Sequence, residues 1–363
     1  MQRWLSLTTL AGLLLAAGCS AHGASTPPLA SGTTATTATA RMTESVVPRA
    51  RLATYRINKA RVYVSGISSG GFFAVQMHVA HSATFKGAAI YAGGVFYCAL
   101  GNVGTALGAC GGEGLYASTL TESEAYLDAM SAAGTIDSEK NLAGQPVYLW
   151  AGKNDTVVAP AEMNDLAAEY VHYGSYVIYD NQFSAEHGWE SPNGELACGT
   201  LGEPYIVNCS LNGRPYDSEQ TWLKLLYGQL HDRNNGKLEG SLINFDQTEF
   251  GATASNSMDT NGYVFVPKPC AQGQTCSLVV AFHGCLQTQS DIGTKFPIEG
   301  GIDPWADHNN IIVLYPYAIK SSPNPENPKG CWDWWGYDDP QYALKAGTQV
   351  SIIYRMVQRL MGT

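Results

Sequence analysis

Short apolar runs alternate with amphipathic stretches along most of the chain beyond residue 50. The apolar runs predict strands, because they are short and rich in β-branched and aromatic side chains. They cover residues 61–65, 87–92, 146–150, 176–179, 242–245, 263–267, 278–282 and 311–315. Helical patterns lie at residues 73–80, 122–132, 160–173, 218–227 and 343–361. This alternation is typical of an α/β fold with a mostly parallel central sheet and helices on both faces.

The first 48 residues have a different character. Residues 1–19 predict a secretory signal, because an apolar run too short to span a bilayer follows Arg3. A membrane anchor is the alternative. The run also resembles a bacterial lipoprotein signal in which Cys19 would be lipidated, although Ala16 replaces the usual Leu. Small and hydroxylated residues dominate the stretch after it, so residues 20–48 predict a flexible tether and residues 49–363 a single folded domain.

The composition excludes two classes of protein. Charged residues make up 14% of the 363 residues, well below the ~25% of an average soluble protein. The net charge is −10, with only 21 Lys and Arg residues, so nucleic-acid binding is excluded. Apolar residues make up 45%, which argues against disorder over most of the chain. The 20 tyrosines and the low charge favour a secreted protein that sits on an apolar or uncharged material.

Eight cysteines remain when Cys19 is set aside, and an even number in an exported chain predicts up to four disulfide bonds. The spacing favours the local pairs Cys98–Cys110, Cys198–Cys209 and Cys270–Cys276, which leaves Cys285 to pair with Cys331. A zinc site is the alternative, but the chain has no Cys-x-x-Cys pair and no His at ligand spacing from these cysteines. We therefore expect neither a metal nor a cofactor.

One G-x-S-x-G motif occurs in the chain, from Gly66 to Gly70 around Ser68. A β-rich run leads into it and a helix-compatible stretch leads out. A sharp strand-to-helix turn of this kind exposes a serine oxygen at the carboxyl edge of a sheet and needs glycines beside it. In a Gly-rich protein the match could arise by chance, but the strand and helix on the correct sides favour a nucleophile.

A serine nucleophile needs a base and an acid that orients the base. Asp155 follows the predicted strand 146–150, and His187 follows the strand 176–179, in the order Ser, Asp, His expected of an α/β hydrolase. Taken alone, Asp155 could be a turn residue or a helix cap. Of the other histidines, His22 lies in the tail, His78, His81 and His172 lie on helices, and His231 and His308 lie in polar loops.

The second oxyanion donor of such enzymes belongs to a loop after an early strand, upstream of the serine. Here the matching loop, His283-Gly284-Cys285, lies far downstream, after the strand 278–282. We therefore expect a circularly permuted α/β-hydrolase fold, in which the late strands take the place of the missing early ones. The alternative, that His283 is the base, would leave His187 and those strands without a role.

Three runs together resemble the esterase-type polyhydroxybutyrate (PHB) depolymerases, over roughly residues 52–361. They are Gly66 to Gln76, His283 to Gln287, and the Trp-rich run Gly330 to Tyr337. The single-domain, circularly permuted branch of the family fits best. The resemblance implies that residues 49–363 are one catalytic domain with a triad of Ser68, Asp155 and His187. It also implies that the backbone N–H groups of Ser69 and Cys285 form the oxyanion hole.

The Trp-rich run has two interpretations. Three tryptophans beside a cystine can simply be core packing. Alternatively, a Cys285–Cys331 bridge would hold the run beside the oxyanion loop. There Trp334 or Trp335 could bind the methyl and methylene groups of a hydroxyalkanoate unit.

The resulting hypothesis is an exported serine esterase that hydrolyses poly- or oligo-(R)-3-hydroxybutyrate. We expect a monomer that is either secreted or a periplasmic or outer-membrane lipoprotein. Many extracellular family members add a linker and a polymer-binding domain. Neither is recognisable here, so soluble oligomers or amorphous polymer are the expected substrates. The alternatives are a feruloyl or acetylxylan-type carbohydrate esterase, and a non-catalytic polymer-binding lipoprotein that keeps the hydrolase fold.

Overall fold

The computed structural model describes residues 49–112 and 116–363. The predicted signal, the lipidation site at Cys19 and the tether lie outside these ranges. Within them, every strand and helix predicted above is present, with boundaries that shift by a few residues. No helix in the described part of the chain has both the length and the apolar character that crossing a bilayer requires.

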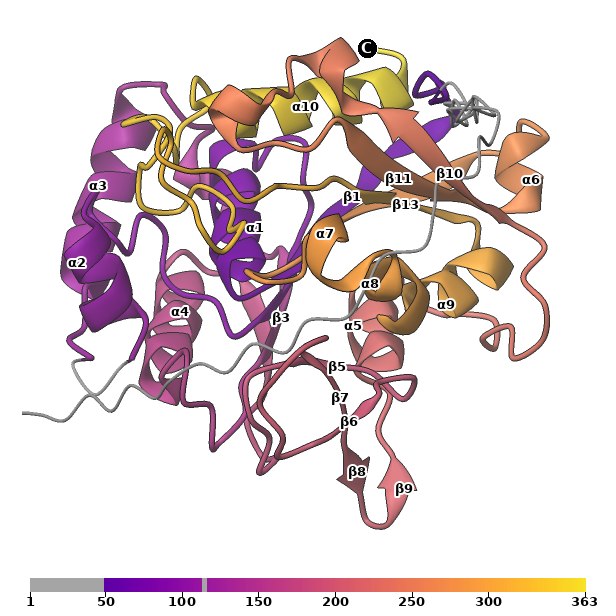
Figure 1. Cartoon of the computed structure of the whole chain (residues 1–363), viewed down its shortest axis with the longest axis horizontal. Coiled ribbons are helices and arrows are strands. Elements are labelled where there is room, and N and C mark those ends of the chain that lie inside the picture. Colours follow the sequence, from indigo (N-terminus) through magenta and orange to yellow (C-terminus); the bar gives the residue numbers. More distant parts are fainter. Residues whose placement is uncertain (1–48, 113–115) are drawn as a thin grey trace, which may run out of the picture. The chain divides into compact units, whose positions relative to one another are not determined.

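An eight-stranded sheet forms the centre of the fold (Figure 1), with the strand order β10-β11-β13-β12-β1-β2-β3-β4. The strands are β1 Ile57–Ile67, β2 Ala88–Tyr91, β3 Pro146–Trp150, β4 Tyr176–Asp180, β10 Ser241–Asp246, β11 Asn261–Val266, β12 Cys276–Phe282 and β13 Ile311–Tyr315. β11 runs antiparallel to both of its neighbours, and the other pairings are parallel. The prediction of a mostly parallel sheet is therefore confirmed.

The strand order agrees with the expected permutation. β1, which leads to Ser68, lies inside the sheet rather than at its edge. The strands that follow it in sequence, β2 to β4, lie on one side of it, and the four latest strands lie on the other. The strands that come last in the chain thus complete the half of the sheet that an unpermuted hydrolase builds first.

Alternating side chains of the strands enter two separate cores, one on each face of the sheet. Val62 and Val64 belong to the core that includes side chains of α1 (Ser69–Ala80), α4 (Pro160–His172) and α10 (Thr348–Met361). Tyr63, between them, belongs to the core that includes side chains of α5 (Ser218–Tyr227), α8 (Lys295–Glu299) and α9 (Ile302–Asn309). All seven residues of β12 are buried, as expected for a strand covered on both faces. The two-sided helical covering predicted from the sequence is confirmed.

The longer helices have identifiable sequence causes. Every residue of α1 is buried, because the helix is almost wholly apolar. α10 has its apolar residues at helical spacing, with Val350, Ile353, Val357 and Leu360 buried. These helices are α1 Ser69–Ala80, α3 Leu120–Ala132, α4 Pro160–His172, α5 Ser218–Tyr227, α9 Ile302–Asn309 and α10 Thr348–Met361.

The hydrophobic pattern of the sequence does not predict several short helices and strands, because these segments are too short to show a periodicity. The short helices are α2 Val103–Thr105, η1 Ala106–Cys110, η2 Glu139–Leu142, η3 Gln247–Phe250, η4 Ala254–Asn256, α6 Lys268–Ala271, α7 Gln289–Ile292 and α8 Lys295–Glu299. The short strands are β5 Trp189–Glu190, β6 Leu196–Ala197, β7 Ile206–Asn208, β8 Ser210–Leu211 and β9 Arg214–Pro215. His308, predicted in a loop, lies instead in the last turn of α9.

Two buried carboxyl groups of α4 hold the loop that follows β2. Glu162 Oε1 accepts the backbone N–H of Val95 at 3.0 Å, and Glu169 Oε2 accepts that of Phe96 at 2.9 Å. Ser123 Oγ donates to the other oxygen of Glu169. Burial raises the pKa of both carboxyl groups to about 8. Two carboxyl groups that are neutral over most of the physiological pH range therefore hold the loop after β2 in place.

This arrangement predicts a pH-dependent stability. The unfolded Glu162 carboxyl ionises near pH 4.5, whereas the folded one ionises near pH 8. Between these values the folded state binds a proton that the unfolded state has lost, so stability falls as the pH rises from about 4.5 to about 8. Glu162→Gln cannot ionise. In thermal unfolding it should resemble the parent at about pH 5 and be more stable at about pH 8.

The control is Glu122→Gln, at an exposed position on α3. It should leave the pH dependence of unfolding unchanged. An equal loss of melting temperature between these two pH values in the parent and in Glu162→Gln would contradict the prediction.

Candidate active site

Ser68 occupies a strained turn between β1 and α1. Its backbone angles are φ 57° and ψ −128°, outside the regions that L-residues prefer. A Cβ on Gly66 would lie 2.1 Å from the carbonyl oxygen of Gly70, and a Cβ on Gly70 would lie 2.3 Å from that of His283. Both positions of the motif therefore require glycine. The Ser68 N–H donates to Tyr91 O at 2.9 Å, which ties the turn to the end of β2.

Asp155 and His187 meet where β3 and β4 end. His187 Nδ1 lies 2.9 Å from Asp155 Oδ2, and both side chains are almost fully buried. The other carboxylate oxygen, Oδ1, accepts the backbone N–H groups of Val157 and Val158 at 2.9 and 2.8 Å. Because the carboxylate accepts from Nδ1–H, the Nε2 atom of the neutral ring keeps a free lone pair for a proton. The structure thus brings together the predicted acid and base, 32 residues apart in sequence.

Glu186 connects the loop that carries Asp155 to the loop that carries His187. Its Oε2 accepts the backbone N–H of His187 at 2.8 Å and that of Thr156 at 3.2 Å. Its Oε1 accepts the Thr156 hydroxyl at 2.8 Å. The sequence analysis assigned Glu186 no role. Its position next to His187 was the only available signal.

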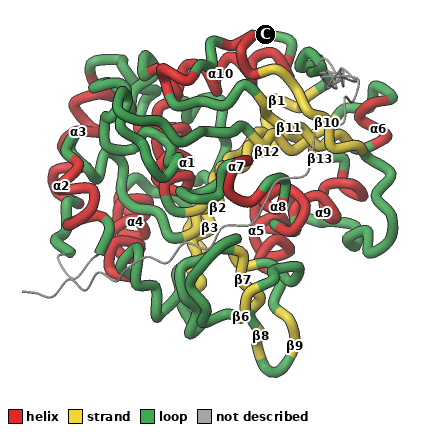
Figure 2. Tube along the Cα trace, in the orientation of Figure 1, coloured by secondary structure: helices red, strands yellow, loops and turns green. Residues whose placement is uncertain are grey.

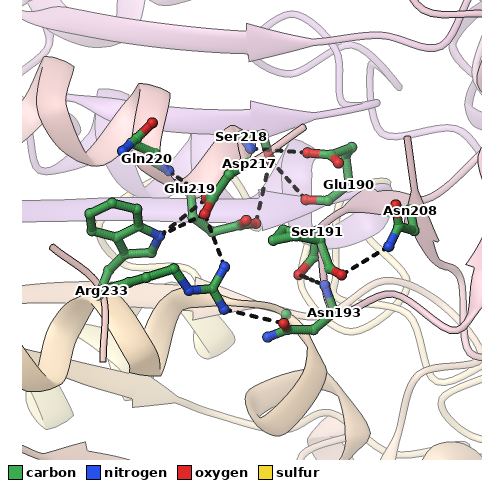
Figure 3. A network of polar contacts seen from close by, with 12 residues as sticks. Glu190, Ser191, Asn193, Asn208, Asp217, Ser218, Glu219, Gln220 and Arg233 are labelled. Atoms are coloured by element: carbon green, nitrogen blue, oxygen red, sulfur yellow. Dashed lines mark hydrogen bonds and ion pairs between the residues drawn. The ribbon is translucent and has the colours of Figure 1, made fainter. Parts of the chain in front are cut away.

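The segment after His187 is anchored to α5 by a polar network (Figure 3). Glu190 Oε2 accepts the N–H of Ser218, and the Ser218 hydroxyl donates to Glu190 O at 2.8 Å. Arg233 bridges Asp217 at 3.0 Å and Asn193 at 3.2 Å. Burial raises the pKa of Glu190 to about 8. The network therefore connects a long segment of little regular structure to the first turn of α5, where the N–H groups of Ser218 and Gln220 find side-chain acceptors.

The loop that follows β12 lies against Ser68. A Cβ on Gly284 would come within 3.1 Å of Ser68 Cβ. The Cys285–Cys331 disulfide joins this loop to the Trp-rich run. Ser69, the other predicted oxyanion donor, is the first residue of α1, where the N–H has no acceptor within the helix. Both predicted donors thus belong to segments adjacent to Ser68.

His283 has no free ring nitrogen. Its Nε2 accepts the backbone N–H of Ala318 at 3.1 Å, so the proton resides on Nδ1, which donates to Gly284 O at 2.7 Å. The residue is fully buried, and burial lowers its pKa to about 4. These contacts argue against the alternative that His283 is the base, and they give it a structural role in the loop.

The Trp-rich run belongs to a long stretch without helix or strand between β13 and α10, drawn as loop in Figure 2. Trp332 is fully buried and donates to His283 O at 3.0 Å. Trp334 stacks on Phe72 with ring centroids 4.1 Å apart and is only 8% exposed. Trp335 is half-buried and meets Trp334 edge to face. Of the two predicted substrate-binding residues, Trp335 is therefore the more accessible.

The remaining cysteines pair as their spacing predicts. Disulfides join Cys98 to Cys110, Cys198 to Cys209 and Cys270 to Cys276. Within residues 49–112 and 116–363, no three His, Cys, Asp or Glu side chains converge in a way that could hold a metal ion.

Comparison with known proteins finds relatives of one kind. A poly(3-hydroxybutyrate) depolymerase of Delftia acidovorans is 40% identical over 324 residues, which is 87% of this chain but 63% of that protein. This chain thus spans less than two thirds of that relative. A polyhydroxybutyrate depolymerase of Talaromyces funiculosus is 37% identical over 325 residues, which is 85% of this chain and 92% of that protein.

Solved structures agree with these relatives, and one family profile matches part of the chain. A PHB depolymerase from Penicillium funiculosum and a PHB depolymerase complexed with R3HB trimer each superpose with a TM-score of 0.78 and 36% identity. Each match covers 86% of this chain and 99% of the solved one. The profile of the prolyl oligopeptidase family matches residues 47–197, the part that contains Ser68, Asp155 and His187.

The contacts of His283 predict that its ring does not titrate near neutral pH. With a pKa of about 4, the ring should stay neutral from about pH 5 upward. Imidazole resonances followed by NMR from pH 5 to pH 8 should include three that do not shift, because burial also lowers the pKa of His78 and of His81 to about 4. One of these three should be missing from the spectrum of His283→Gln. A His283 ring that titrates near its ordinary pKa of 6.5 would contradict the prediction.

Proposed function

Because this chain belongs to the polyhydroxybutyrate depolymerase family, we propose that it is an exported serine esterase that hydrolyses poly- or oligo-(R)-3-hydroxybutyrate. The observation that carries the proposal is the buried contact of His187 with Asp155 in loops that follow β3 and β4, two parallel strands on one side of the β1 strand that leads to Ser68. The relative complexed with R3HB trimer supports the substrate class. Four disulfides support folding in an oxidising compartment outside the cytoplasm.

The proposed reaction has two halves. Ser68 Oγ attacks the ester carbonyl carbon while His187 Nε2 takes the hydroxyl proton. The charge that develops on the carbonyl oxygen is held by the N–H groups of Ser69 and Cys285. The intermediate then collapses, the bond to the leaving alcohol breaks, and His187 protonates that alcohol. Water attacks the resulting acyl-enzyme with His187 again as base, which releases the hydroxy acid and restores Ser68. Asp155 keeps the proton of His187 on Nδ1 throughout.

Several exposed apolar side chains would suit an apolar substrate. In the described ranges they belong to the connections that follow β2, β3, β4 and β12. They are Leu100, Val103, Leu107, Val157, Leu201 and Ile298. The Ser68, Asp155 and His187 loops leave the sheet at the same edge. A polyester carries no charge, so apolar contact rather than ion pairing must supply its binding energy. Trp335, which is half-buried, is our candidate for contact with the methyl groups.

The test of this proposal is hydrolysis of the (R)-3-hydroxybutyrate trimer, together with clearing of a suspension of amorphous polyhydroxybutyrate. Acetylated and feruloylated xylan serve as competing substrates, and a fluorophosphonate probe reports whether Ser68 is nucleophilic. Activity on xylan esters without activity on the trimer would indicate a carbohydrate esterase. A folded protein that neither reacts with the probe nor hydrolyses any ester would indicate a non-catalytic binding protein.

The proposed roles of the site residues predict how strongly each substitution lowers kcat. Ser68→Ala and His187→Ala should each lower kcat on the trimer by about 10⁴- to 10⁶-fold, because the members of a triad act as a unit. His283→Ala should lower it much less, because His283 supports the loop without exchanging protons. Steady-state kinetics on folded variants measures this order. An inactive His283→Ala beside an active His187→Ala would reverse the assignment of the base.

A further inference from the structure

We propose that Gln287 is a positioning residue that aims the oxyanion donor of Cys285 and couples its loop to the segment packed against His187. The inference rests on the proposed function, since it concerns the oxyanion hole of that same site. Gln287 is fully buried and ends the run His283-Gly284-Cys285-Leu286-Gln287. Nothing in the triad chemistry requires it.

The hydrogen bonds of the loop single out the N–H of Cys285. The N–H of Gly284 donates to Gln287 Oε1 at 2.6 Å, and that of Leu286 donates to Lys329 O at 2.8 Å. Between them, the Cys285 N–H has no hydrogen-bond acceptor within the described ranges. A donor left free beside Ser68 is what an oxyanion hole requires.

Gly284 is held on both of its polar groups. His283 Nδ1 donates to its carbonyl oxygen at 2.7 Å, and Gln287 accepts from its N–H. The Gly284 carbonyl and the Cys285 N–H belong to one planar trans peptide, so they point in opposite directions. Fixing Gly284 therefore fixes the direction of the Cys285 N–H. Glycine itself imposes little order on its backbone, which makes these side-chain contacts necessary.

The amide nitrogen of Gln287 reaches the other part of the site. Its Nε2 donates to Pro204 O at 2.8 Å and lies 3.4 Å from Tyr205 O. Tyr205 O also accepts the N–H of Trp189, two residues after His187, and the rings of Tyr205 and His187 meet edge to face at 6.4 Å. One side chain thus connects the oxyanion loop to the segment that packs against the base.

Only a neutral side chain with both a donor and an acceptor can make this bridge. A carboxylate would accept from Gly284 but would face the Pro204 carbonyl with a buried charge. An apolar side chain of the same size would fill the space and leave the Gly284 N–H and the Pro204 carbonyl unpaired. The two substitutions Gln287→Glu and Gln287→Met therefore separate the contacts of the residue from its volume.

The test compares substrate binding with binding of a tetrahedral adduct. A trifluoromethyl ketone with a short acyl chain adds reversibly to a serine hydroxyl, and the ketone oxygen becomes the oxyanion. For Gln287→Met we expect the inhibition constant of this ketone to rise about 10- to 100-fold, because a misaimed donor loses much of its effect. kcat/KM on the trimer should fall by the same factor, while KM stays within about two-fold. Gln287→Glu should lie between this variant and the parent.

The matched control is Gln145→Met. Gln145 makes the same kind of bridge before β3, at the end of the sheet away from the site, since its Oε1 accepts from His78 Nε2 at 2.6 Å and its Nε2 donates to Ser82 O at 3.0 Å. It should lose stability in thermal unfolding without a change in the ketone inhibition constant. Parent-like inhibition of both Gln287 variants, or an equal rise of the inhibition constant in Gln145→Met, would overturn the proposal. Activity of the parent on the trimer reports separately on the proposed function.

Discussion

The close approach of two backbones organises the active site. The first turn of α1 lies against the chain that leaves β12, so near that a Cβ on Gly70 would overlap the carbonyl oxygen of His283. This contact places Ser68 beside the loop that carries Cys285, although the two are far apart in sequence. It is possible only without side chains at the crossing, and it forces Ser68 into a backbone conformation that the neighbouring contacts must hold in place.

The loops around this crossing are held by buried polar side chains rather than by regular structure. Glu186 joins the Asp155 and His187 loops, Gln287 joins the loop after β12 to Pro204, and Glu162 holds the loop after β2. Backbone N–H and carbonyl groups in buried loops must find partners, and a single side chain that reaches two segments satisfies and aligns them together. Burial, which raises the pKa of Glu162 and lowers that of His283, keeps both groups in their uncharged forms near neutral pH.

The order of the strands in sequence matters little to this arrangement. β12 and β1 are neighbours in the sheet, and their carboxyl ends bring Cys285 and Ser68 together whichever of them the chain forms first. The Asp155–His187 contact depends in the same way on β3 and β4 being parallel neighbours. A permuted chain can therefore build the same site, because the site depends on pairings between strands and not on their connections.

The sequence alone determined the elements, the permuted strand order and the candidates Ser68, Asp155 and His187. Apolar periodicity indicates which segments are strands and helices, and the glycines around Ser68 indicate a sharp turn in which a Cβ at those positions has no room. The cystine pairs also followed from their spacing.

Only the tertiary structure showed that His187 contacts Asp155 while the ring of His283 is bonded to backbone groups, and only it assigned contacts to Glu186 and Gln287. A histidine in sequence carries no sign of whether its nitrogens are free, and both nitrogens of His283 turn out to be bonded to backbone groups. A glutamine that bridges two loops depends on segments about 80 residues apart, and no local pattern records such a contact. These roles come from long-range packing, which brings together groups that are unrelated along the chain.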